Sequence, residues 1–137
     1  MKLELRPRTD LTLRTIAVLS DGERWRAADL AERVGTTPAY AAHVIGPLVR
    51  AGWVQSSPGP IGGHRLAVDL TTVSLLQLIE AVEGPTDDGR CVMASHPCPA
   101  PEPCALHDTW MRARDALTAE LDATSLRSII HDQEVRS

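Results

Sequence analysis

The fold is decided by residues 27–50, which read Ala-Ala-Asp-Leu-Ala-Glu-Arg-Val-Gly-Thr-Thr-Pro-Ala-Tyr-Ala-Ala-His-Val-Ile-Gly-Pro-Leu-Val-Arg. The apolar spacing predicts a helix over residues 27–34, closed by Gly35 in the position that glycine favours after a helix. A second helix follows at once, with Thr36 or Thr37 as its N-cap and Pro38 in its first turn. Two helices joined by a tight glycine turn are typical of a helix-turn-helix.

The second of these helices would present its N-terminal residues to DNA, because recognition helices meet base edges there. The residues expected to do so are Thr36, Thr37, Ala39, Tyr40 and His43. Pro47 has no N–H to donate to the carbonyl of His43, so we expect a kink or an early end near residue 46.

The flanking segments complete a winged helix-turn-helix. An apolar segment from Thr9, as N-cap, to about Leu19 predicts a helix before the motif. Residues 53–55 and 65–68 predict two strands around a turn rich in glycine and proline, which makes a hairpin. Such a hairpin could be a DNA-contacting wing, with Gly62 and Gly63 near its tip, or an ordinary hairpin loop. A helix beginning at Thr72 or Ser74 would end at Gly84-Pro85.

All three cysteines of the chain, Cys91, Cys98 and Cys104, lie in one loop, and His107 follows the last of them. Five prolines between residues 85 and 104 exclude a helix or a central strand there. The odd cysteine count and the absence of a signal-peptide pattern disfavour a disulfide framework. Thiolates and an imidazole could hold zinc or an iron–sulfur cluster, and spacing alone does not separate the two. Three thiols without a metal are the remaining interpretation.

A single apolar stripe follows the loop. It recurs at gaps of four, three, four and four residues, which fits one face of a long helix, and consists of Leu106, Trp110, Ala113, Leu117 and Leu121. A small winged-helix body cannot easily cover so long a stripe, so we expect dimerisation through it, with packing inside one subunit as the alternative. A short helix over residues 125–130, capped by Thr124, and a frayed tail after it complete the prediction.

Composition limits the possible function classes. The chain has 137 residues and 43% hydrophobic residues, which fits one small domain with a core. No apolar run approaches the ~20 residues that span a membrane, so we expect a cytoplasmic protein. Residues 1–68 carry nine basic and six acidic residues (+3), and residues 69–137 carry five and twelve (−7). The residues expected to contact DNA phosphates are Arg6, Arg8, Arg14 and Arg65. No phosphate loop, nucleophile elbow or acid–base carboxylate pair indicates an enzyme.

The chain resembles the Rrf-two (Rrf2) family of bacterial winged-helix transcriptional regulators. The likeness rests on residues 9–14, residues 57–63, the three-cysteine loop after Glu83-Gly84, and residues 104–110. The resemblance implies a mainly α fold and a homodimer that binds a partly palindromic DNA operator. It implies further that the three cysteines hold an iron–sulfur cluster beside the dimer helix, and that nitric oxide, redox state or iron status acts on DNA affinity through that cluster.

The resemblance leaves two fourth ligands open. His107 matches the position that completes a 2Fe–2S site in some members, whereas Asp10 matches one that reaches a 4Fe–4S site from the partner subunit in others. This chain departs from the family at the wing, where Pro58 replaces a common arginine. A zinc-stapled winged helix that binds DNA or protein without redox sensing is the alternative function. The expected division is residues 1–84 for DNA binding, 85–105 for the cluster, 106–131 for dimerisation and the last helix, and 132–137 for the tail.

Overall fold

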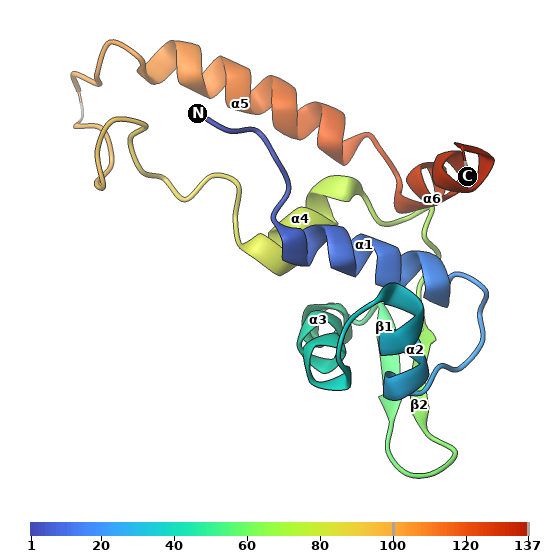
Figure 1. Cartoon of the computed structure of the whole chain (residues 1–137). Helices are drawn as coiled ribbons and strands as arrows, with labels where there is room; N and C mark the ends of the chain where they lie inside the picture. Colours follow the sequence, from blue (N-terminus) through green and yellow to red (C-terminus); the bar gives the residue numbers. More distant parts are fainter. Residues whose placement is uncertain (100, 137) are drawn as a thin grey trace.

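The computed structural model describes residues 1–99 and 101–136 and is mainly helical, with a small two-stranded sheet (Figure 1). Its elements are α1 (Pro7–Leu19), α2 (Ala27–Val34), α3 (Pro38–Arg50), β1 (Val54–Ser57), β2 (Gly63–Leu66), α4 (Leu75–Glu83), α5 (His107–Asp122) and α6 (Leu126–Arg136). This order and arrangement confirm the predicted winged helix-turn-helix. No helix within the two described ranges is long and apolar enough to cross a membrane.

The helix-turn-helix forms as predicted. Gly35 adopts the left-handed conformation (φ 78°, ψ 40°) that allows the chain to turn sharply after α2. Thr37 is the N-cap of α3, and its Oγ1 accepts a hydrogen bond from the N–H of Tyr40 at 3.2 Å. Pro38 occupies the first turn, where its missing N–H costs nothing.

The helix α1 begins earlier than predicted, at Pro7 rather than after Thr9. Proline suits the first position of a helix, so the start moves to that residue. Thr9 is fully buried, and its hydroxyl donates to the carboxylate of Glu83 in α4. Thr9 therefore joins α1 to α4 and does not cap the helix.

The predicted early end of α3 near residue 46 is wrong, because the helix continues through Pro47 to Arg50. Pro47 is buried, and Leu48 beside it belongs to the core, so tertiary packing holds this last turn. The carbonyl of His43, which an N–H at position 47 would otherwise serve, accepts a hydrogen bond from Nη2 of Arg8 at 3.1 Å. The lost helical bond is thus replaced from α1.

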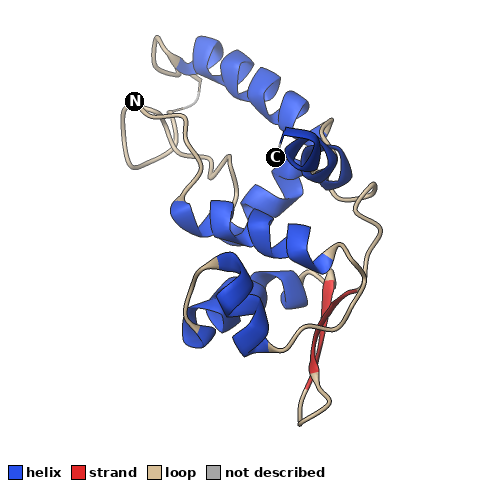
Figure 2. Ribbon diagram, turned by 45° about the vertical axis from the view of Figure 1, so that its right-hand side comes forward, coloured by secondary structure: helices blue, strands red, loops and turns tan. Residues whose placement is uncertain are grey.

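The hairpin is antiparallel, with Val54 opposite Leu66 and Ser57 opposite Gly63. It projects from the helical body (Figure 2). Trp25 adds a short third segment to it, since its backbone exchanges two hydrogen bonds of 2.8 and 2.7 Å with His64. The predicted hairpin is therefore confirmed, and it is anchored to the loop before α2. Its strands extend nearer to the tip than the predicted residues 53–55 and 65–68.

The end of the chain differs in detail from the prediction. Helix α6 is capped by Ser125 rather than Thr124, because the Ser128 N–H donates to Ser125 Oγ at 3.2 Å. The helix also continues past residue 131 to Arg136, since residues 126–136 contain neither glycine nor proline to stop it. Part of the tail expected to fray is therefore helical; Ser137 lies outside the described residues.

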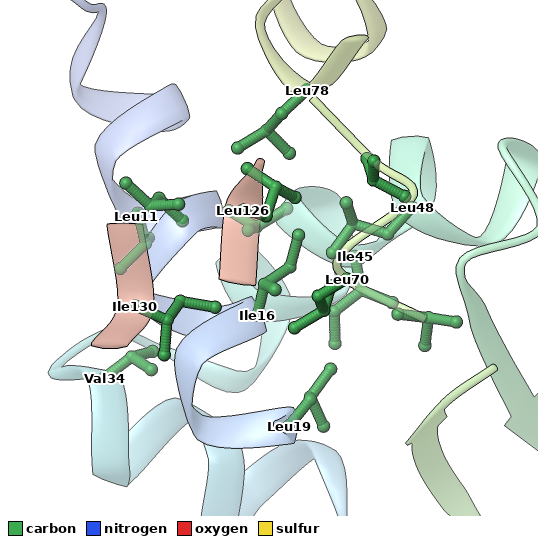
Figure 3. Close-up of a cluster of buried hydrophobic side chains, with 14 of the residues drawn as sticks. Leu11, Ile16, Leu19, Val34, Ile45, Leu48, Leu70, Leu78, Leu126 and Ile130 are labelled. Carbon is green, nitrogen blue, oxygen red and sulfur yellow. The ribbon is translucent and has the colours of Figure 1, made fainter. Parts of the chain in front are cut away.

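The core gathers side chains from α1 to α4, the first strand and α6. Ile16, Leu48 and Leu78 from α1, α3 and α4 are fully buried, and Leu126 and Ile130 of α6 lie among them (Figure 3). Backbone bonds from Leu126 to Val73 and from residue 127 to residue 70 fix the position of α6. The last helix is thus part of the same core as the helix-turn-helix.

Candidate metal centre and nucleic-acid interface

The loop between α4 and α5 brings the three cysteine sulfurs together. Cys104 Sγ lies 3.6 Å from Cys91 Sγ and 3.6 Å from Cys98 Sγ, and all three sulfurs lie within 4.8 Å of one another. A hydrogen bond closes the loop beside the first thiol, because the Cys91 N–H donates to the His96 carbonyl at 2.9 Å. The predicted convergence of the three cysteines is therefore present in a single chain.

The thiols open onto a hollow of about 190 Å³ between the loop and the start of α5. His107, Trp110, Met111 and Arg114 line it from α5, and Asp87, Arg90 and Val92 line it from the loop, together with Gly89 and the three cysteines. Arg114 joins the two walls, since its Nη1 lies 2.9 Å from Asp87 Oδ1. Asp87, Arg90, Met111 and Arg114 were not among the predicted site residues. The spacing of His107, Met111 and Arg114, which places them on one helical face, is the signal that could have identified the last two.

The thiols differ in how readily they ionise. The N–H of Met93, whose nitrogen lies 3.4 Å from Cys91 Sγ, and the thiol of Cys98 lower the pKa of Cys91. The backbone of Cys104 acts to lower the pKa of Cys98, but the neighbouring thiol of Cys91 and burial outweigh it and raise that pKa. Cys91 therefore becomes the thiolate that a metal requires more readily than Cys98 does.

The two candidate fourth ligands lie in different surroundings. His107 lines the same hollow as the thiols, although it is not among the ligand atoms that converge. Asp10 lies on α1, and its carboxylate is 3.1 Å from Nε of Arg14. Within one chain the donor set is therefore three sulfurs with one imidazole nearby, which fits either tetrahedral zinc or iron held by thiolates.

The exposed end of α3 carries the residues expected to read DNA. Thr37, Ala39, Tyr40 and His43 are exposed, and Thr36 is half-buried. The rings of Tyr40 and His43 lie 5.9 Å apart and share one face of the helix. This surface offers an aromatic hydroxyl and an imidazole but no cation at its first turn.

Each of the four arginines expected to contact phosphates makes an internal contact. Arg6 Nε lies 3.8 Å from Glu83 Oε2, and Arg65 Nε donates to the Gly22 carbonyl at 2.8 Å. Arg14 binds both Asp10 and the Val34 carbonyl, and Arg8 binds the His43 carbonyl. These contacts hold α1 and the wing against neighbouring elements, so the four side chains are structural as well as basic.

The two wing glycines are required by the hairpin itself. A Cβ on Gly63 (φ 141°) would lie 2.5 Å from the Trp25 carbonyl oxygen, and one on Gly62 would lie 2.1 Å from that of Ser57. The close approach of these backbones explains both glycines without DNA.

The apolar stripe of α5 is only partly covered by its own chain. None of the residues from His107 to Asp122, all of which the structure describes, is buried. Leu106 at the N-cap and Leu117 are 42% and 39% exposed, whereas Trp110 and Leu121 are half-buried. Ala113 is exposed as well. The stripe therefore does not form the core of a single subunit.

Known proteins match both the sequence and the structure. Residues 7–132 match the model of the Rrf2 family, described as iron-dependent transcriptional regulators. The transcriptional regulator IscR of Escherichia coli is 30% identical over 120 residues, which cover 88% of this chain and 74% of that protein. Among solved structures, T. potens IscR superposes with a TM-score of 0.74 at 20% identity, over 100% of this chain and 93% of that one. CymR of B. subtilis, the global cysteine regulator, gives 0.72 at 22%, over 95% and 98%.

These matches extend over the helix-turn-helix, the wing and the cysteine loop alike, and the relatives are regulators of transcription rather than enzymes. The chain belongs to the Rrf2 family of DNA-binding transcriptional regulators.

Proposed function

We propose that this protein is a homodimeric transcriptional regulator whose affinity for operator DNA is controlled by an iron–sulfur cluster on Cys91, Cys98 and Cys104. The observation that carries the proposal is the convergence of the three sulfurs within 4.8 Å, in a loop with little apolar surface to order it. A family described as iron-dependent and a relative named IscR support iron over other metals.

His107 is proposed as the fourth ligand, because it lines the hollow beside the thiols and needs no second chain. A cluster would supply a redox-active, chemically labile group that nitric oxide, oxidants or iron shortage can remove. The chain's own residues would convert its loss into movement. Arg114 of α5 forms an ion pair with Asp87 of the loop, so disorder in the loop would break this contact and release α5 from the loop.

The homodimer is proposed to form through the exposed α5 stripe. Two recognition helices would then lie on one face, and twofold half-sites require them about one helical turn of DNA apart, roughly 34–36 Å. A small change at α5 would alter this separation and hence the affinity for the operator.

The zinc-stapled alternative uses the same donors, since three thiolates and one imidazole are a common tetrahedral zinc set. In that case zinc would have a structural role and would keep the loop ordered at all times. DNA affinity would not respond to oxidants that leave zinc in place.

The test is anaerobic purification followed by visible absorption and analysis of iron, sulfide and zinc. We expect a coloured protein with matched iron and sulfide, and a colourless Cys98→Ala variant. His96→Ala is the matched control, because this exposed histidine lies in the same loop but outside the converged ligand set. A colourless wild-type protein with stoichiometric zinc would replace the cluster by the zinc staple.

A further inference from the structure

The recognition helix contains a carbonyl that its own backbone cannot serve. In α3 the N–H at position 47 would bind the carbonyl of His43, but Pro47 has none. Nη2 of Arg8 in α1 donates to that carbonyl at 3.1 Å. We infer that Arg8 is a positioning residue for DNA recognition, which replaces the missing helical bond and sets where Tyr40 and His43 lie.

The surroundings of Arg8 favour this internal role over a phosphate contact. The side chain is half-buried, and its Nε is buried without a partner among the described residues. Its backbone carbonyl accepts from the hydroxyl of Thr12, which is fully buried, so α1 is fixed at this point. A guanidinium drawn inward from a fixed helix is poorly placed to follow the DNA backbone.

The hydrogen bond from Arg8 lies at the turn of α3 that carries the side chains expected to contact DNA bases. His43 and Tyr40 face outward from the same turn whose carbonyl Arg8 holds. Pro47 is buried one turn further along the same face of the helix, at the i + 4 position from His43. The proline and the arginine therefore form a pair, in which one removes a backbone donor and the other supplies its replacement from a different helix.

A double-mutant cycle tests the pairing, because alanine at position 47 restores an N–H for the His43 carbonyl. The proteins are wild type, Arg8→Ala, Pro47→Ala and the double variant. The probe is a duplex that the wild-type protein selects from a randomised library, titrated over a range of salt concentrations. Arg136→Ala, an exposed arginine at the far end of α6, controls for loss of one positive charge.

We expect Arg8→Ala to weaken binding about tenfold, because the His43 carbonyl loses its hydrogen bond from a charged donor. In the Pro47→Ala background the same change should alter affinity less than twofold. The slope of log affinity against log salt should stay at its wild-type value. If Arg8→Ala does not fold, the double variant should, since its helical bond is restored.

A phosphate contact would behave differently. Loss of one phosphate contact would make the negative slope shallower by about 0.9. Pro47→Ala would not restore the lost affinity. The proposal would be overturned by any one of three results. These are a tenfold loss of DNA affinity that persists in the Pro47→Ala background, a shallower salt dependence of affinity, and a double variant that does not fold.

Discussion

Arg14 holds Asp10 one helical turn away in α1, with its Nε 3.1 Å from the carboxylate Oδ2. The same guanidinium donates through Nη1 to the Val34 carbonyl at the end of α2, at 3.3 Å. Asp10 therefore has a role within its own chain that does not require iron. His107, which lines the thiol hollow, is the proposed fourth ligand.

The first prediction separates these two ligands. Asp10→Ala should keep the iron content and the absorption spectrum, whereas His107→Ala should lose iron or shift the spectrum. Asp10→Ala should also change the free energy of unfolding by less than about 1 kcal/mol, because the ion pair is more than half exposed. Iron analysis and urea unfolding provide the measurements. Loss of iron in Asp10→Ala with retention in His107→Ala would transfer the ligand role to the carboxylate.

A second prediction concerns α6 as part of the winged-helix core. Leu126 is fully buried in the cluster that holds Ile16 and Leu78, so Leu126→Ala should lower the free energy of unfolding by about 2–5 kcal/mol. Val135→Ala, on the same helix but 73% exposed, should change it by no more than about 0.5 kcal/mol. Denaturant unfolding of both variants makes the comparison. Equal effects would mean that α6 does not belong to the core.

The sequence predicted the elements whose signals are local. Gly35 and Thr37 mark the turn and cap of the helix-turn-helix, and both act as expected. The predictions failed where the local structure depends on a residue that is distant in the sequence. Pro47 alone predicts a broken helix, yet packing on the core and the bond from Arg8 keep α3 intact. Local propensity cannot report a donor that arrives from 35 residues away along the chain.

The candidate site shows the same division. Three cysteines among prolines were enough to predict convergence, because few other structures would place thiols in such a loop. The roles of the arginines were harder to predict. A basic side chain near a recognition helix can contact a DNA phosphate or bind a group within its own chain, and the sequence pattern is the same in both cases. Only the geometry shows that Arg65 reaches Gly22 and that Arg8 reaches His43.

A third prediction follows from the wing. Burial lowers the pKa of His64, whose Nδ1 lies 2.6 Å from Ser56 Oγ. The unfolded chain therefore binds more protons at this site just below pH 6.5, so the free energy of unfolding should rise with pH through that window. Urea unfolding at a series of pH values gives the slope, and His64→Gln should remove this part of it. An NMR titration placing the His64 pKa above 6.5 would contradict the prediction.

The fourth prediction tests the dimer that is proposed to form through the exposed stripe of α5. Leu117→Glu places a charge in the middle of the stripe and should convert a dimer to monomer in sedimentation analysis, with a large loss of affinity for a two-half-site duplex. Ala119→Glu adds the same charge on the opposite face of the same helix, about 200° around its axis, and should leave the dimer intact. Both positions are exposed in the single chain, so neither variant should unfold. A wild-type monomer at all concentrations, or equal dissociation of both variants, would show that the stripe is not the dimer interface.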